Sequence, residues 1–237
     1  MRWSDAHADG VLALSAAVSA VELVIAALAL AAALLAPGAP RERLGLVRPR
    51  LRGRETAVLA VGTLGLSHAL DAILAQTGLY AQSELARFAL HMQGARGLPL
   101  VVAALAIGGL PALAEELLCR GVLQRSLAAR LGPAAGIALA ALVFGALHLE
   151  PIHASFATLL GAYLGVAGYW SGSVWTPIAC HAINNLFAIG ISAHSGPTAS
   201  ASPVDVAIGL AVAAGALVHV RGRVRRRLQP AAGFDDG

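Results

Sequence analysis

The chain has 237 residues, of which 57% are hydrophobic and only 13% are charged. With a mean hydropathy of +0.72, it has too little polar surface to cover a water-soluble globule, which excludes an ordinary soluble domain and favours a polytopic membrane protein. The net charge of +4 does not indicate a nucleic-acid partner, because the basic residues cluster at the ends of apolar segments, where they set membrane topology.

Apolar segments long enough to cross a bilayer recur along the chain, since a crossing helix needs roughly 20 mostly apolar residues. Seven are expected, with six to eight plausible: Val11–Ala36, Thr56–Gln76, Leu98–Leu131, Pro133–Leu149, His153–Trp170, Trp175–Ile191 and Val204–Val220. The first is too long for the core of a signal peptide and is expected to be retained. Between the second and third segments, Leu85, Phe88, Ala89 and Met92 repeat at helical spacing and predict a short interfacial helix. The predicted fold class is therefore all-α, a helical bundle forming one transmembrane domain over residues 1–237.

Arginines gather in three places along the chain, at 41–54, 120–130 and 221–227. Cytoplasmic loops of membrane proteins carry an excess of Lys and Arg. Seven spans with the N-terminus outside put all three groups in the cytoplasm. The segment Ser192–Pro203, which contains no Lys or Arg, then lies outside. We therefore expect an external N-terminus and a cytoplasmic C-terminus.

Three sets of polar residues interrupt the apolar segments: Glu115-Glu116 with Arg120, Phe144 with His148, and His181 with Asn185. Ionisable groups at membrane depth cost about 2.5–3.5 kcal/mol each, so they are kept mainly for pairing or for function. Neighbouring helix residues point about 100° apart, and Glu115 and Glu116 cannot serve one point equally. Arg120 shares a face with Glu116. The simplest division makes Glu116–Arg120 a structural pair and leaves Glu115 free for another task.

The histidines come from two further segments. His181 and Asn185 lie one turn apart and share a face, whereas Asn184 is turned about 100° away and is the weaker candidate. Each set alone could be structural: a buried ion-pair network, a packing histidine, or a His/Asn pair that fastens helices. Together the groups match the needs of peptide hydrolysis, because a carboxylate with an imidazole such as His148 activates water and N–H donors stabilise the oxyanion. Glu with two His is also a zinc ligand set, so zinc held by Glu115, His148 and His181 stays open.

Other polar residues match none of these sets. His68 and Asp71 share a face of the second apolar segment. Glu150 and His153 flank Pro151 and are interpreted as the wet boundary of a helix rather than as ligands. Glu22 interrupts the first apolar segment and is assigned no role.

In order and spacing the three sets resemble the motifs of a known family. Glu-Glu-x-x-x-Arg at 115–120, Phe-x-x-x-His at 144–148 and His-x-x-x-Asn at 181–185 are similar to those of the CPBP family of intramembrane proteases. That family includes the CAAX prenyl proteases of the Rce type and the Abi-like, bacteriocin-processing group. The resembling core covers Leu98–Ile191, while the first two spans and the tail match only in being hydrophobic.

The resemblance implies a catalytic set of Glu115, His148, His181 and Asn185, supported by Glu116 and Arg120. In this family pattern the first two residues activate water and the last two stabilise the oxyanion. Members have been described both as metalloproteases and as metal-free glutamate proteases. No cofactor is favoured for this chain, and zinc is the alternative.

We therefore expect an intramembrane endopeptidase in a prokaryotic plasma membrane. Its partners would be the bilayer and a membrane-associated protein or peptide, prenylated or anchored at its C-terminus, and not nucleic acid. One alternative is a non-proteolytic immunity or scaffold protein that keeps the family core. Another is a transporter, because Pro111 close to Glu115 leaves a helix break possible, although no inverted repeat is visible.

Overall fold

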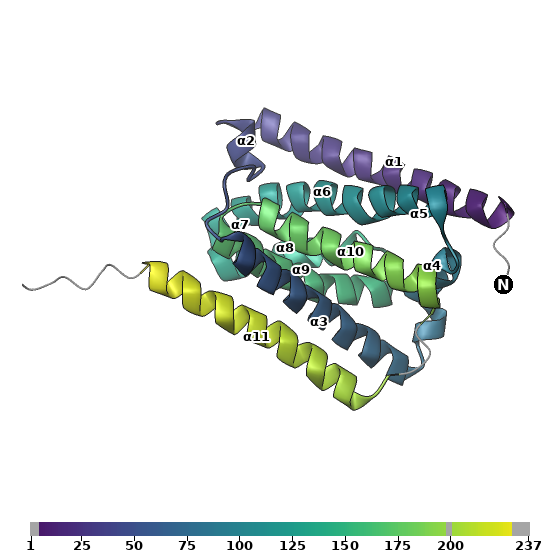
Figure 1. The fold of residues 1–237 in the computed structure, drawn as a ribbon. Coiled ribbons are helices and arrows are strands. Elements are labelled where there is room, and N and C mark those ends of the chain that lie inside the picture. The colour runs from purple at the N-terminus through teal and green to yellow at the C-terminus, as the bar shows by residue number, and fades with distance from the viewer. Residues whose placement is uncertain (1–4, 198–200, 229–237) are drawn as a thin grey trace, which may run out of the picture.

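The structure, a computed structural model, describes residues 5–197 and 201–228. All regular structure in these two ranges is helical, which confirms the predicted all-α class. The long helices lie side by side along a common direction (Figure 1). They are α1 (Asp5–Leu35), α3 (Gly53–Thr77), α8 (Pro133–Ala146), α9 (Pro151–Ser171), α10 (Trp175–Ser195) and α11 (Pro203–Leu228). Shorter elements are α2 (Pro40–Arg43), a 3-10 turn (Tyr80–Gln82) and α4 (Glu84–Met92), which is the predicted short helix.

One continuous helix runs through residues 97–131, but its turns are not uniform. It consists of α5 (Gly97–Ala103), a π-helical segment (Ala104–Gly109), α6 (Leu110–Glu116), a second π-helical segment (Leu117–Leu123) and α7 (Gln124–Leu131). Pro111 lies in the first turn of α6, directly after the wider π turns. Since proline lacks an N–H and clashes with the preceding turn of a regular α-helix, a wide turn accommodates it. The helix break that the transporter alternative needs at Pro111 is therefore absent.

Five helices in the described part of the chain are long and apolar enough to cross a membrane. They are α1, α3, the continuous helix Gly97–Leu131, α9, and α11 as far as Arg226. Of the two remaining expected spans, α8 has only 14 residues, and α10 has 21 but carries the polar His/Asn motif. By length and composition the count is thus five rather than seven, and the chain is an integral membrane protein.

Two predicted boundaries move in the structure. α10 continues to Ser195, so the expected external loop Ser192–Pro203 is shorter than predicted, and residues 198–200 lie outside the described part of the chain. α11 continues past Val220 to Leu228. The C-terminal arginines therefore begin inside the last helix rather than after it.

Small residues set how closely neighbouring helices approach. A Cβ added to Gly145 of α8 would lie 2.5 Å from the carbonyl oxygen of Ala154 in α9, and one added to Gly209 of α11 would lie 2.5 Å from that of Gly65 in α3. The hydrophobic effect does not drive helix association inside a membrane, because lipid tails are as apolar as the side chains. Membrane helices therefore associate through close packing at small residues such as these. The close α8–α9 contact fixes the position of the turn that follows α8, which carries His148.

The arginine groups lie at the same end of the bundle, with the exception of Arg120, which was expected in the cytoplasm but is buried within the bundle. Figure 1 places α2, the end of α7 and the C-terminal end of α11 there, while α4 and the end of α10 lie at the opposite end. At the arginine end, Arg125 Nη1 donates a hydrogen bond to the carbonyl oxygen of Gly172 over 3.3 Å. The connection between α9 and α10 is thereby tied to α7.

Candidate active site

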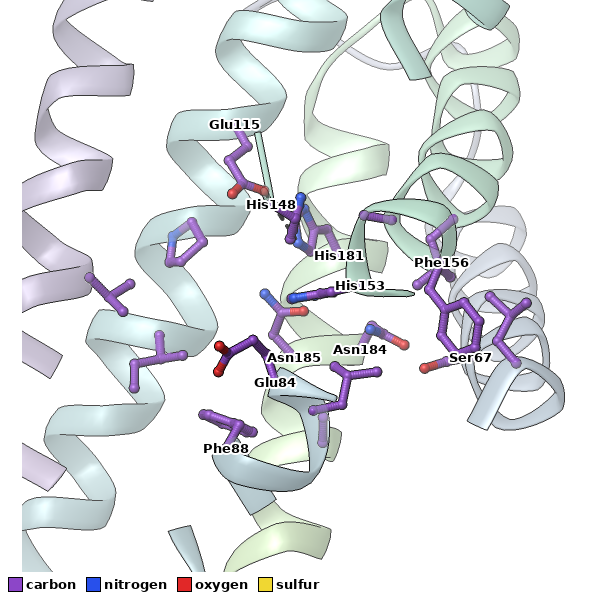
Figure 2. Close-up of a pocket in the computed structure, with 18 of the residues that line it drawn as sticks. Ser67, Glu84, Phe88, Glu115, His148, His153, Phe156, His181, Asn184 and Asn185 are labelled. Carbon is purple, nitrogen blue, oxygen red and sulfur yellow. Dashed lines mark ion pairs between the residues drawn. The ribbon is translucent and has the colours of Figure 1, made fainter. Parts of the chain in front are cut away.

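A cavity of about 560 Å³ lies inside the bundle, walled by α1, α3, α4, α6, α8, α9 and α10. Much of its lining is aliphatic and aromatic. Its polar lining includes the four predicted catalytic residues, Glu115, His148, His181 and Asn185 (Figure 2). Three segments that lie far apart in the sequence thus bring these side chains to one cavity, as is typical of binding sites between helices.

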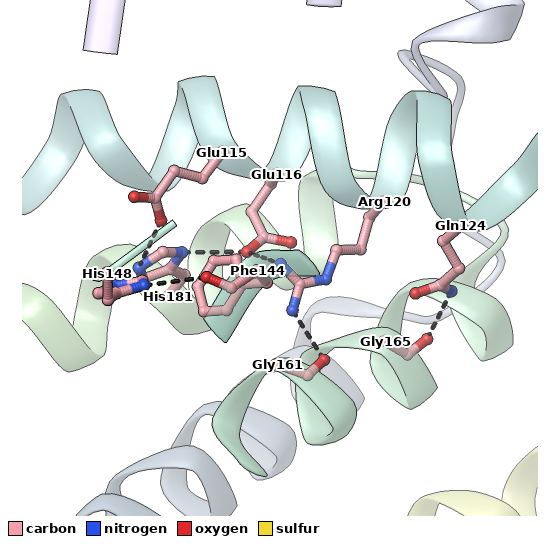
Figure 3. A network of polar contacts seen from close by, with 9 residues as sticks. All are labelled: Glu115, Glu116, Arg120, Gln124, Phe144, His148, Gly161, Gly165 and His181. Carbon is pink, nitrogen blue, oxygen red and sulfur yellow. Dashed lines mark hydrogen bonds and ion pairs between the residues drawn. The ribbon is translucent and has the colours of Figure 1, made fainter. Parts of the chain in front are cut away.

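Glu116 and Arg120 form a buried pair beside the cavity. Arg120 Nη1 donates to Glu116 Oε1 over 2.8 Å, and Nη2 donates to the carbonyl oxygen of Gly161 over 2.7 Å. The guanidinium also lies over the ring of Phe144, 4.4 Å from its centroid (Figure 3). Both charged side chains are almost fully buried, Glu116 being 0% and Arg120 2% exposed. The pair therefore links the continuous helix to α8 and α9 and keeps both charges compensated.

The ring of His181 lies between the two glutamates. Its Nδ1 is 3.0 Å from Glu116 Oε1, and its Nε2 is 3.8 Å from Glu115 Oε2 (Figure 3). An ionised carboxylate can only accept hydrogen bonds, so Nδ1 is the nitrogen that carries the hydrogen toward Glu116. Phe144 packs edge-on against this ring, with 5.6 Å between centroids. Glu116 thus orients His181, while Glu115 faces the cavity.

His148 lies in the turn that follows α8. Its Nδ1 is 2.9 Å from the carbonyl oxygen of Phe144, one turn earlier, and donates to it. This hydrogen bond leaves Nε2 as the nitrogen available for proton transfer. The chain then turns sharply through Leu149, whose φ of 58° lies in the left-handed region that non-glycine residues seldom adopt. Such strain occurs often at functional sites.

His153 has a contact that was not predicted. Glu150 does mark the helix boundary, since its carboxylate accepts hydrogen bonds from the N–H groups of Ile152 and His153 at 2.9 Å each and caps α9. The ring of His153, however, packs against that of His148 with 4.3 Å between centroids and lines the same cavity. His153 therefore lies at the helix boundary, as predicted, and also belongs to the lining of the cavity, which was not predicted.

The two neighbouring asparagines of α10 both line the cavity but diverge within it. Asn185 lies beside His153, whereas Asn184 points toward Ser67 and Phe156 (Figure 2). The Oδ1 atom of Asn184 is buried without a hydrogen-bond partner. The predicted separation of the two side chains is present, although Asn184 does not leave the site.

Sequence reasoning left out Gln124 and named Glu22 without assigning it a role. Gln124, one turn after Arg120, donates from Nε2 to the carbonyl oxygen of Gly165 over 2.9 Å and repeats the Arg120–Gly161 contact one turn along α9. Glu22 of α1 reaches the cavity and faces Glu115. In the sequence Glu22 stands out as the one charged residue between Val11 and Leu35, and the structure adds the direction in which it faces.

A metal centre was the alternative for the same side chains. Within residues 5–197 and 201–228, no group of three or more His, Cys, Asp or Glu side chains is placed to hold a metal ion. Glu115, His148 and His181 do not form such a group. The contacts of His181 Nδ1 with Glu116 and of His148 Nδ1 with the Phe144 carbonyl fix the orientation of both rings.

Comparison with known proteins agrees with this geometry. Residues 97–187 match the family model described as type II CAAX prenyl endopeptidase Rce1-like, and this segment contains all three motifs. Neither the curated proteins nor the solved structures gave a significant match. Since the matched family is one of proteases, a peptidase is the class of protein that the segment supports. With this match and its three motifs in order, the segment at residues 97–187 is similar to the Rce1-like intramembrane proteases of the CPBP family.

Proposed function

We propose that this protein is an intramembrane endopeptidase that hydrolyses a peptide bond of a membrane-associated protein or peptide. The observation that carries the proposal is the cavity in which Glu115, His148, His181 and Asn185 meet inside an otherwise apolar bundle. Glu115 lines this cavity, whereas Glu116 and Arg120 do not. Oε2 of Glu115 is buried without a hydrogen-bond partner, so the reacting water can be its partner.

The water is activated by Glu115 with His148. The carboxylate takes a proton from the water, and Nε2 of His148 orients that water while Nδ1 is held by the Phe144 carbonyl. The resulting hydroxide adds to the peptide carbonyl carbon and gives a tetrahedral oxyanion. Collapse of this intermediate breaks the C–N bond as the proton held by Glu115 passes to the leaving amine.

The oxyanion is stabilised from α10. Asn185 supplies an amide N–H, and His181 supplies Nε2–H when its ring carries a second proton, because the hydrogen on Nδ1 is directed at Glu116. The Glu116–Arg120 pair acts through His181, since it fixes the orientation of the ring. These two residues therefore position the site rather than touch the substrate.

The substrate that suits this cavity has an apolar segment beside the cleaved bond. The aliphatic and aromatic walls accept such a segment, and Glu115 with His148 and His181 can meet the bond to be cleaved. The name of the matched family, CAAX prenyl endopeptidase, suggests a peptide bond near a prenylated cysteine. We also propose the orientation expected from charge, with the arginine end of the bundle in the cytoplasm of a prokaryotic plasma membrane.

The proposal is tested with purified protein and an internally quenched peptide that ends in a farnesylated CAAX sequence. Wild-type protein should cleave the peptide, and Glu115→Gln should lower turnover by about 100-fold or more, since general-base groups contribute on that order. The matched control is Glu42→Gln on the exposed helix α2, which should leave turnover unchanged. Equal cleavage by Glu115→Gln and wild type would contradict the assignment. The same peptide without farnesyl shows whether the lipid is needed.

A further inference from the structure

A glutamate outside the matched segment faces the proposed base. Glu22 lies on α1, where it is the one charged residue between Val11 and Leu35. It is only 5% exposed, while its neighbours Val21 and Leu23 are 58% and 61% exposed on the outer surface of the bundle. An ionisable group in an apolar span is costly and is kept mainly for function. α1 is therefore rotated so that its one mid-helix charge points inward.

The inward side of α1 at this level is the cavity. Glu22 and Glu115 line the cavity together, and their carboxyl groups are close enough to interact. Oε2 of Glu22 is buried without a hydrogen-bond partner. No basic side chain in the described part of the chain forms an ion pair with Glu22. The carboxyl group of Glu115 is therefore the interaction partner that the surroundings of Glu22 offer.

Glu115 needs such a partner more than Glu116 does. Glu116 Oε1 is held by Arg120 at 2.8 Å and by His181 at 3.0 Å. Glu115 faces His181 Nε2 at 3.8 Å, which is too long for a hydrogen bond. Without a second contact, the side chain of the base would be free to change rotamer inside the cavity, and a misplaced catalytic group loses much of its effect.

We propose that Glu22 is a positioning residue for the catalytic carboxylate. Its carboxyl group donates a hydrogen bond to Glu115 and turns the remaining oxygen of Glu115 toward the reacting water. Two carboxyl groups can share a hydrogen bond when one of them holds a proton. The second oxygen of Glu115 then remains available to accept a proton from the water. The reaction site is thus completed by α1, outside residues 97–187.

This inference rests on the proposed peptidase function, and substitutions at position 22 test it by turnover of the farnesylated peptide. Glu22→Leu should lower kcat roughly 10- to 100-fold with little change in KM, because a charge-assisted hydrogen bond to the base is lost. Glu22→Gln should restore most of the turnover, since its amide still donates. Ser15→Ala is the matched control on α1, because this hydroxyl is buried and bonds only the carbonyl of Val11 in its own helix; its kcat should equal that of wild type.

Thermal unfolding separates positioning from a structural role. Glu22→Leu should keep or raise Tm, since replacing a buried carboxyl by an apolar side chain removes a desolvation penalty. A purely structural Glu22 would instead lower Tm and leave kcat unchanged. In a cycle of Glu22→Leu, Glu115→Gln and the double variant, Tm shifts should be non-additive, as for residues in contact.

The two failures are distinguishable. Full kcat in Glu22→Leu, together with an inactive Glu115→Gln, would overturn the role of Glu22 and leave the peptidase intact. Additive Tm shifts would overturn the contact whether or not the peptide is cleaved. Equal activity of Glu115→Gln and wild type would reject the proposed function itself.

Discussion

At the scale of single residues, the adjacent glutamates have different surroundings although they are neighbours in the chain. Glu116 is fully buried and is held by Arg120 and His181. Glu115 faces the cavity, Glu22 and the other edge of the His181 ring. The 100° between successive helix residues produces this division. One turn of helix thereby supplies both a structural ion pair and a free carboxylate.

Removing Arg120 should destabilise the protein strongly. In Arg120→Ala, Glu116 loses its counter-ion while it stays buried, and breaking a buried pair in this way costs about 3–5 kcal/mol. The contact with the Gly161 carbonyl and the stacking on Phe144 are lost as well. Thermal unfolding in detergent should show a clear drop in Tm. Arg125→Ala is the control, because Arg125 is partly exposed and makes a longer contact of 3.3 Å; an equal drop there would show that the burial of Glu116 is not the cause.

The asparagines of α10 offer a second paired test. Losing one oxyanion donor lowers turnover roughly 100- to 1000-fold, so Asn185→Ala should reduce kcat on that order with a smaller effect on KM. Asn184→Ala should be much milder, because its side chain points toward Ser67 and Phe156 (Figure 2). If Asn185 only fastens helices, its variant should instead show a lower Tm and near-normal kcat in the folded fraction. A stable, fully active Asn185→Ala protein would remove this residue from the mechanism.

At the scale of helices, a glycine sets the α8–α9 distance and with it the position of His148. In Gly145→Ala the new Cβ would meet the Ala154 carbonyl oxygen at 2.5 Å and overlap the hydroxyl of Thr158. The helices must separate, at about 1–3 kcal/mol for an overpacked contact. Both Tm and turnover should fall. Gly190→Ala in α10 is the matched control, since nothing lies within 4 Å of its added Cβ; a similar loss there would point to a general effect of the substitution.

Helix positions could be predicted from the sequence much better than helix geometry. Runs of apolar residues predicted the long helices and α4, because lipid-facing and core-facing positions are both apolar. The π-helical segments on either side of α6 carry no comparable pattern, since each depends on how the whole helix packs. The inward rotation of α1 likewise follows from packing. For this reason the motif residues were identified from their spacing, whereas the position of Glu22 opposite Glu115 and the contact of His153 with His148 were not.

At the scale of the whole molecule, the orientation in the membrane can be tested directly. The arginine groups, apart from the buried Arg120, lie at one end of the bundle (Figure 1), and that end should be cytoplasmic. A reporter fused after Arg227 should therefore report a cytoplasmic position. One inserted between Ser195 and Pro203, at the opposite end, should report an external position. A C-terminal fusion found outside would overturn the orientation while leaving the fold unchanged.

Part of the cavity wall is formed by helices that lie outside the segment matched by the family model. Residues 97–187 carry the motifs, but α1, α3 and α4 close the space around them. The motifs and much of the cavity wall are therefore encoded in separate stretches of the gene. A chimera that joined residues 97–187 to the leading helices of another protein would keep every motif residue, but it would lose Glu22 unless the new first helix supplied a carboxyl group at that position. Recombination between such genes would thus change the cavity wall without altering a single motif residue.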